Sequence, residues 1–109
     1  VHRTVKQQTH QVTIEDILKV VCEHWSVNQE EVFSKSRKAN IVAVRQAAMY
    51  LAQEHTKLTS SKIGLFIGGR NHATVLHSIR QVNDRMTMDK GYAQDIRNIE
   101  NKLGVAKRK

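Results

Sequence analysis

Proline is absent from this sequence, glycine occurs only five times, and aromatic residues make up 5% of the chain. A β-sandwich needs many tight turns and favours aromatic and β-branched strands, so this composition argues against that class. Ala, Leu, Gln and Lys, which favour helices, are plentiful together with Val and Ile. A chain of 109 residues is long enough for one domain with a modest core. We therefore expect one all-α domain.

Cysteine occurs once, as Cys22. It cannot form a disulfide within the chain, and its apolar neighbours indicate a small buried side chain. A lone thiol fits the reducing cytoplasm, where we expect the protein to act. No apolar run approaches the length of a membrane-spanning helix, and the polar N-terminus does not have the pattern of a signal peptide.

Acidic residues are nearly missing from the middle of the chain, although the formal net charge is +8. Between Val32 and Asn83 there is one acid, Glu54. The same segment holds eight basic residues, which are Lys35, Arg37, Lys38, Arg45, Lys57, Lys62, Arg70 and Arg80. So strong a bias indicates a surface that binds a polyanion, with nucleic acid as the first candidate and an acidic membrane surface as the second.

Apolar residues repeat at helical spacing between Thr13 and Gly104, which predicts a compact bundle of about six helices. The starts of four helices are marked by capping residues, which are Thr13 (in a capping box with Asp16), Asn28, Thr59 or Ser60, and Asn71. Glycines mark two ends, one at Gly68 or Gly69 and one at Gly104. The third helix is expected at about residues 40–55 and the fourth at about 60–67.

The third predicted helix has one apolar stripe, formed by Val44, Ala47, Ala48 and Leu51, and Arg45 is expected to face the opposite way. The ends of the chain lack periodicity. Residues 1–12 predict a linker or N-terminal arm, and residues 105–109 a basic C-terminal tail. The helical domain is therefore expected to span residues 13–104.

A short helix, a glycine turn and a longer helix meet in the stretch GLFIGGRNHATVLHSI, residues 64–79. This order is typical of a helix-turn-helix, whose second helix enters the major groove of DNA with its first residues at the base edges. Arg70 to Thr74 open that second helix here. Arg and Asn side chains hydrogen-bond guanine and adenine, and Ala or Thr methyl groups contact thymine. The pattern predicts double-stranded DNA binding, with a purely structural helix pair as the alternative.

The same residues resemble the signature of the C-terminal domain of the DnaA family of bacterial replication initiators, Ile-Gly-x-x-Phe-Gly-Gly-Arg-Asp-His-Thr-Thr-Val-Leu-His. The stretch SKSRKANIVAVRQAAMYLAQEHT, residues 34–56, is similar to the family's basic loop and the helix after it. The resemblance covers about residues 13–103. It implies a Trp-repressor-like helix-turn-helix that binds an asymmetric DnaA box at the replication origin, as a monomer, in the initiation of chromosomal replication.

Carried over by position, the resemblance implies that Arg37 enters the minor groove and that Arg45 contacts a phosphate. It also implies that Asn71 to Thr74 meet bases or the backbone, with Ser60 and Ser61 near a thymine. The full set of expected DNA contacts is Arg37, Lys38, Arg45, Thr59, Ser60, Ser61, Lys62, Arg70, Asn71, His72, Ala73 and Thr74.

Several positions depart from the family pattern. Asn71 replaces an Asp that accepts a hydrogen bond from a cytosine amino group, and the Asn oxygen is expected to accept in its place without the charge. Ala73 replaces Thr, Ser60-Ser61 replaces Leu-Pro, and Ala39 and Ala43 stand where relatives are often basic. These departures affect the fine sequence preference and not the kind of ligand.

An enzyme is the first rival reading, because the chain has six histidines. His72 and His77 are five residues apart, so on one helix they diverge by about 140° and cannot share a metal. The glycines are not a P-loop, since no Gly-Lys-Ser/Thr follows them. We expect no enzymatic activity and no cofactor in this domain, because the ATP of the initiator is bound by an AAA+ module that this chain does not contain.

A basic helical module that binds an acidic phospholipid surface or a protein partner is the second rival reading. The polar face of the third predicted helix lacks the Trp, Phe and Leu flank of interfacial helices, so we rank DNA first and acidic phospholipid as a minor partner.

Overall fold

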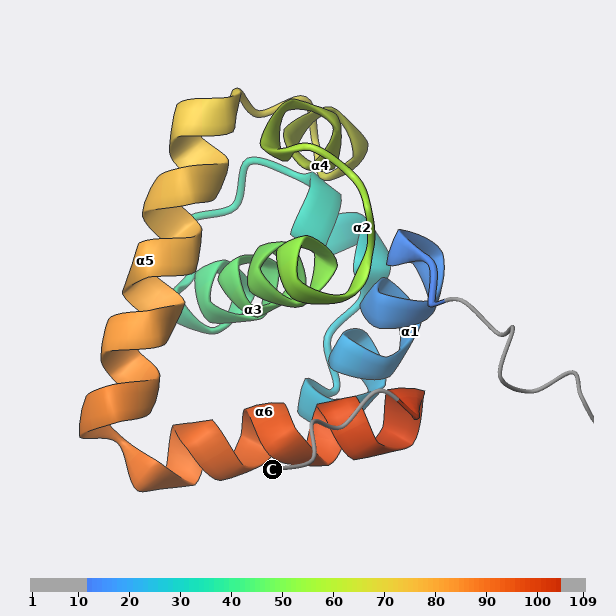
Figure 1. Cartoon of the computed structure of the whole chain (residues 1–109). Coiled ribbons are helices and arrows are strands. Elements are labelled where there is room, and N and C mark those ends of the chain that lie inside the picture. The colour runs from blue at the N-terminus through green and yellow to red at the C-terminus, as the bar shows by residue number, and fades with distance from the viewer. Residues whose placement is uncertain (1–11, 105–109) are drawn as a thin grey trace, which may run out of the picture.

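Helix α3 is the central element of the structure, a computed structural model that describes residues 12–104. The described residues form six helices, α1 (Ile14–Trp25), α2 (Gln29–Phe33), α3 (Ala39–His55), α4 (Ser60–Phe66), α5 (His72–Met88) and α6 (Lys90–Leu103). Helices α1, α2, α4 and α5 all pack against α3, and α6 packs against α1 and α5 at one end of the molecule (Figure 1). The predicted all-α bundle is confirmed.

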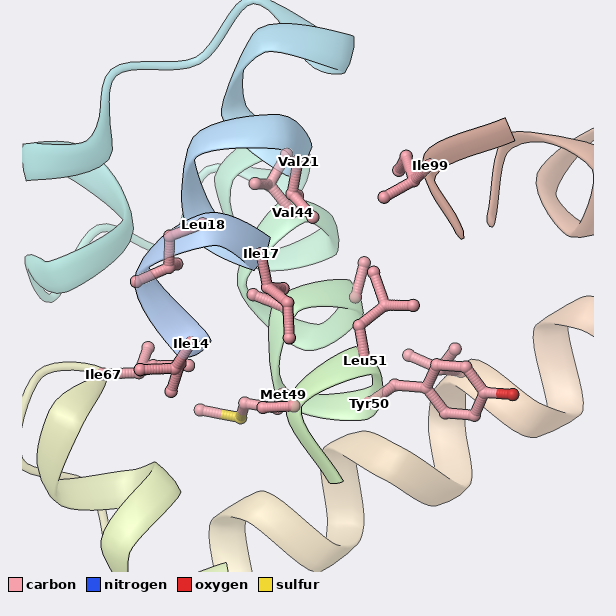
Figure 2. Packing of buried hydrophobic residues seen from close by; sticks show 14 of the residues in the cluster. Ile14, Ile17, Leu18, Val21, Val44, Met49, Tyr50, Leu51, Ile67 and Ile99 are labelled. Carbon is pink, nitrogen blue, oxygen red and sulfur yellow. The ribbon is translucent and has the colours of Figure 1, made fainter. Parts of the chain in front are cut away.

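The core surrounds α3 on several sides. The predicted stripe of Val44, Ala47, Ala48 and Leu51 is buried, and so are Met49 and Tyr50 on other faces of the same helix. Ile17 and Val21 of α1 pack against this helix, and Ile14 of α1 and Ile67 at the end of α4 belong to the same core cluster (Figure 2). The small Ala47 and Ala48 let neighbouring helices approach α3 closely. The position of α4, and hence of the helix after it, is therefore set by the main core.

Four predicted N-caps are confirmed. The side chains of Thr13, Asn28, Thr59 and Asn71 each accept a hydrogen bond from a backbone N–H in the first turn of the helix that follows, and Thr13 forms the expected capping box with Asp16. Thr59, and not Ser60, is the cap of α4. The predicted end at Gly104 is confirmed as a left-handed C-cap. The limits of these helices thus follow from short stretches of sequence.

Residues 1–11 of the predicted arm and residues 105–109 of the predicted tail lie outside the described residues. Val12, the last residue of the predicted arm, lies outside the helices but is 7% exposed and belongs to the core cluster. An apolar residue next to a capped helix start can fold back onto the core in this way. Cys22 is buried as expected, and burial raises the pKa of its thiol.

Two histidines connect α6 to α1 and α3. His24, in the last turn of α1, lies 3.2 Å from Asp95, and His55, in the last turn of α3, lies 2.8 Å from Glu100. Trp25 and Tyr92 stack with ring centroids 6.2 Å apart, and burial raises the pKa of Tyr92 to about 12. These contacts hold α6 across the ends of α1 and α3.

Candidate nucleic-acid interface

The turn between α4 and α5 sets the direction of the second helix. Gly68 and Gly69 both have positive φ, at 78° and 70°, so both of the alternative predicted glycines adopt the left-handed conformation. The Arg70 backbone N–H donates to the Gly64 carbonyl at 2.7 Å. A Cβ atom at Gly64 would meet the Arg70 carbonyl oxygen. The turn therefore folds tightly back on α4 because Gly64 has no side chain.

The first turn of α5 presents four consecutive exposed residues, Asn71 to Thr74. Asn71 Oδ1 accepts from the Thr74 N–H at 2.9 Å, which fixes the side chain of the cap. Val75, directly after them, is fully buried and anchors the turn in the core. The residues predicted to contact bases are thus exposed at the start of a helix that Val75 anchors in the core.

The basic loop between α2 and α3, residues 34–38, carries Arg37 and Lys38, and both side chains are exposed. Ser36 N–H donates to Ser34 Oγ at 3.2 Å, and Lys38 N–H donates to Ser36 Oγ at 3.3 Å. These serine bonds hold the loop backbone although it belongs to no helix. Arg37 therefore projects from a structured segment.

The start of α4 holds the remaining predicted contacts. Thr59, Ser61 and Lys62 are exposed, and Ser60 is half-buried with its hydroxyl 3.4 Å from Gln53 Oε1. The Thr59 hydroxyl accepts from the Lys62 N–H at 3.2 Å, so this side chain is occupied as a cap. Ser61 and Lys62 are the two side chains here with the best access to a ligand.

Arg45 does not face away from the core, and that expectation is wrong. The side chain is buried, with 7% of the residue exposed, and it donates from Nε to the Val32 carbonyl at 2.9 Å and from Nη2 to the Ser34 carbonyl at 3.0 Å. The physical reason is that α2 covers the side of α3 that a single apolar stripe leaves to solvent. The phosphate contact expected of Arg45 stays a prediction that this burial disfavours.

Arg70 is also engaged within the protein. It donates from Nη1 to the Ile67 carbonyl at 2.9 Å and from Nη2 to the Ser34 carbonyl at 2.7 Å. Burial lowers the pKa of both arginines, and the neighbouring positive charge of Arg70 lowers the pKa of Arg45 further. Two cationic groups thus meet where the basic loop touches the turn before α5.

The charge of this side of the molecule favours an anion. Helices α3 and α5 have no acidic residue in their first turns, so the positive ends of their dipoles are not neutralised there. Exposed Lys35, Arg37 and Lys38 precede the start of α3 in the sequence, and exposed Lys62 lies in the first turn of α4. Phosphate groups would meet backbone N–H groups at helix starts together with exposed cationic side chains.

Three further side chains of α5 are exposed that are not among the expected DNA contacts. Leu76, His77 and Arg80 are exposed on α5 beyond its first turn, opposite the buried Val75 and Val82. The helical spacing of the buried stripe could have found them, because the residues between stripe positions must face outward.

Other kinds of site are not apparent in the described part of the chain. Within residues 12–104, no group of three His, Cys, Asp or Glu side chains could hold a metal ion. None of the described helices is long and apolar enough to cross a membrane. A hollow of about 570 Å³ is lined by residues of α1, α3, α5 and α6, among them Trp25, Asn40, Arg85 and Tyr92.

Comparison with known proteins identifies relatives over nearly the whole chain. The family model described as "Bacterial dnaA protein helix-turn-helix" matches residues 14–82. The Chromosomal replication initiator protein DnaA of Bacteroides fragilis is 47% identical over 103 residues, 94% of this chain and 22% of the relative. That of Porphyromonas gingivalis is 41% identical over 100 residues, 92% of this chain and 21% of the relative. The chain thus spans about a fifth of the length of these relatives.

Proposed function

The chain belongs to the bacterial DnaA helix-turn-helix family, a family of DNA-binding domains without catalytic function, and from this premise we propose that it recognises one asymmetric DnaA box in double-stranded DNA. The first turn of α5 lies in the major groove in this proposal, and Arg37 of the basic loop lies in the neighbouring minor groove. One copy of the domain occupies one box.

The observation that carries the proposal is that the start of α5 and the basic loop are joined by a hydrogen bond between Arg70 and the Ser34 carbonyl, which we call the joint. Asn71 to Thr74 are exposed at the start of α5, and Arg37 is exposed three residues after Ser34. The Ser34 carbonyl accepts from Arg70, the residue just before Asn71, at 2.7 Å. The two groups therefore belong to one surface, and a duplex offers two adjacent grooves to such a surface.

Each group suits the groove proposed for it. Asn, His and the methyl groups of Ala73 and Thr74 can contact base edges in the major groove, where the four base pairs differ. A single arginine without a partner suits a narrow A·T-rich minor groove, because the negative potential is strongest there. Lys38, Ser61 and Lys62 are proposed to contact phosphates, which fix orientation without reading sequence.

The wider role follows from the relatives. They are named chromosomal replication initiator proteins, and we propose that this chain is the DNA-binding part of such an initiator, acting in the cytoplasm at the replication origin. ATP binding would belong to another part of the initiator, and the domain itself is proposed to need no cofactor.

A second candidate function is binding to acidic phospholipid, and one observation favours it. Leu65 and Phe66 at the end of α4 are 71% and 41% exposed, close in sequence to Lys62. Apolar side chains beside a cation are what an anionic membrane surface takes up. Retention by anionic but not neutral vesicles, at a salt concentration that preserves box binding, would support it.

The test of the main proposal is a titration of the protein with a labelled duplex containing a DnaA box and with a duplex of the same composition in shuffled order. We expect the box to bind about a thousandfold more tightly at moderate salt. The affinity for both duplexes should fall steeply as the salt concentration rises, because phosphate contacts are common to both. Equal affinity for the two duplexes would refute sequence recognition.

A further inference from the structure

Two arginines from different helical units bond the same backbone oxygen. Arg45 of α3 and Arg70 of the turn before α5 both donate to the Ser34 carbonyl, at 3.0 and 2.7 Å. Each is itself anchored, Arg45 through Val32 and Arg70 through Ile67, both at 2.9 Å. The first residue of the basic loop is therefore joined directly to the turn that directs the reading helix.

This arrangement costs free energy that packing alone would not require. Burial lowers the pKa of both guanidinium groups, and the charge of Arg70 adds to the effect on Arg45. An apolar pair of similar volume would avoid both the desolvation and the repulsion. A fixed guanidinium, however, directs several N–H donors at set angles, which makes it suited to setting geometry.

The joint at Ser34 extends to Arg37 through the loop itself. Ser34 Oγ donates to the Glu31 carbonyl at 2.6 Å and accepts from the Ser36 N–H at 3.2 Å. Ser36 Oγ in turn accepts from the Lys38 N–H at 3.3 Å. A continuous set of hydrogen bonds thus runs from Arg70 to both neighbours of Arg37.

We propose that Arg45 and Arg70 are positioning residues that hold the basic loop in register with the first turn of α5, so that Arg37 and the reading residues engage two grooves at once. The inference rests on the proposed function. Its physical basis is preorganisation, since a loop already fixed in its bound geometry loses less conformational entropy when the duplex binds. Neither arginine needs to touch DNA for this effect.

The test measures what Arg37 contributes to binding with and without the joint. Arg37→Ala is titrated against the box duplex in three backgrounds, which are the unaltered chain, Arg70→Ala and Arg70→Lys. Arg70→Lys keeps the charge but lacks the planar group that bonds Ile67 and Ser34 together. Arg80→Ala is the matched control, because it removes one exposed positive charge from α5 outside the joint. His72→Ala is measured in the same backgrounds.

We expect Arg37→Ala to weaken box binding about tenfold in the unaltered chain and in Arg80→Ala, the loss of one good contact. In both Arg70 variants the loss should fall to about threefold or less, because the basic loop is no longer held in its bound geometry before the duplex binds. The loss caused by His72→Ala should be the same in all backgrounds. A general weakening of the fold would instead reduce both losses together.

A full tenfold loss from Arg37→Ala in both Arg70 variants would overturn the inference while leaving the proposed function intact. Arg70→Ala alone could instead reduce the slope of log affinity against log salt concentration by about one unit, with the effect of Arg37→Ala unchanged. That result would make Arg70 a phosphate contact and overturn the inference. Equal binding of the unaltered chain to box and shuffled duplex would remove the proposed function and the inference with it.

A measurement without DNA tests the inference if the variants bind the duplex too weakly for titration. Backbone ¹⁵N relaxation of Ser36 and Lys38 in Arg70→Lys should show larger amplitude motion than in the unaltered chain, with the α5 amides unchanged. Unchanged relaxation in the loop would overturn the inference.

Discussion

At the scale of single residues, the cap of α5 limits what Asn71 can read, because one lone pair of its carbonyl oxygen is used inside the protein. Oδ1 accepts from the Thr74 N–H at 2.9 Å. The second lone pair of Oδ1 and the two N–H groups of Nδ2 remain for other partners. The expected acceptance of a hydrogen bond from a cytosine amino group stays a prediction, and the second lone pair of Oδ1 would have to make that bond.

Replacing Asn71 with Asp tests this restriction. An Asp can cap α5 with one oxygen and accept from cytosine with the other, so Asn71→Asp should shift the preferred base at one position toward cytosine, by about 1–3 kcal/mol. Affinity for shuffled DNA should fall, because a negative charge then faces the phosphates. Titration against duplexes with each of the four base pairs at every position of the box measures the shift. An unchanged preference at all positions would show that Asn71 does not face a base.

His72→Ala should weaken binding to the box by about 1–3 kcal/mol and binding to shuffled DNA much less. His72 is exposed on the first turn of α5 and has no part in its cap, so thermal unfolding should be unaffected. Losses of equal size on both duplexes, with equal melting temperatures, would mean that this side chain contacts the backbone and reads no base.

Arg45 shows where residue-scale prediction failed. Its position beside Val44 on α3 suggests an outward direction when only one apolar stripe is counted. Helix α3 is covered on several sides, and the carbonyls of Val32 and Ser34 attract the guanidinium into the joint with α2. Contacts between segments distant in the sequence leave no periodic pattern. The two arginine hydrogen bonds to the Ser34 carbonyl therefore could not be predicted.

At the scale of elements, prediction succeeded because helix limits depend on neighbouring residues. The caps Thr13, Asn28, Thr59 and Asn71 each act on an N–H two or three residues ahead. Helix α3 begins at Ala39, one residue before the expected start, and its N-cap Lys38 forms no side-chain cap bond. Of the candidate DNA contacts, the elements that carry them were predictable, and the internal bonds of Arg45 and Arg70 were not.

The glycine turn yields an element-scale prediction with a control built into the chain. A Cβ atom at Gly68 would lie 2.6 Å from the Phe33 carbonyl and would also collide with the Arg70 guanidinium. A Cβ at Gly69 would meet nothing within 4 Å, although φ is positive at both residues. We expect Gly68→Ala to lower the free energy of unfolding by about 3 kcal/mol or more and Gly69→Ala by about 1–2 kcal/mol.

Urea unfolding followed by circular dichroism measures both losses. Equal losses in the two variants would mean that the turn relaxes freely around Gly68, and the proposed joint at Arg70 would then be less rigid than its hydrogen bonds indicate.

At the scale of the whole molecule, acids and bases are separated along the chain. Helices α1 and α2 carry acids in their first turns, whereas α3 and α5 do not, and the expected DNA contacts all lie between Arg37 and Thr74. Helix α6 carries none of these contacts and closes the other end of the bundle (Figure 1). Stability and DNA binding can therefore be altered separately.

His55 and Glu100 provide the test of that separation, with side chains only 8% and 10% exposed. His55→Ala leaves the Glu100 carboxylate without this hydrogen bond and should cost about 1–3 kcal/mol of unfolding free energy. His55→Ala combined with Glu100→Ala should cost less than the sum of the single changes, because no charged partner is left behind. Box affinity of the folded variants should not change. A large loss of affinity in His55→Ala would show that α6 affects the DNA-binding surface.

The most direct test of the central claim, that one domain engages both grooves of one box, is a dimethyl sulfate footprint. This reagent methylates guanine N7 in the major groove and adenine N3 in the minor groove, so one experiment reports both. We expect protection of guanine N7 within the box and of adenine N3 at its A·T-rich end, with Arg37→Ala abolishing only the adenine protection. Protection confined to one groove, or adenine protection that survives Arg37→Ala, would contradict the account.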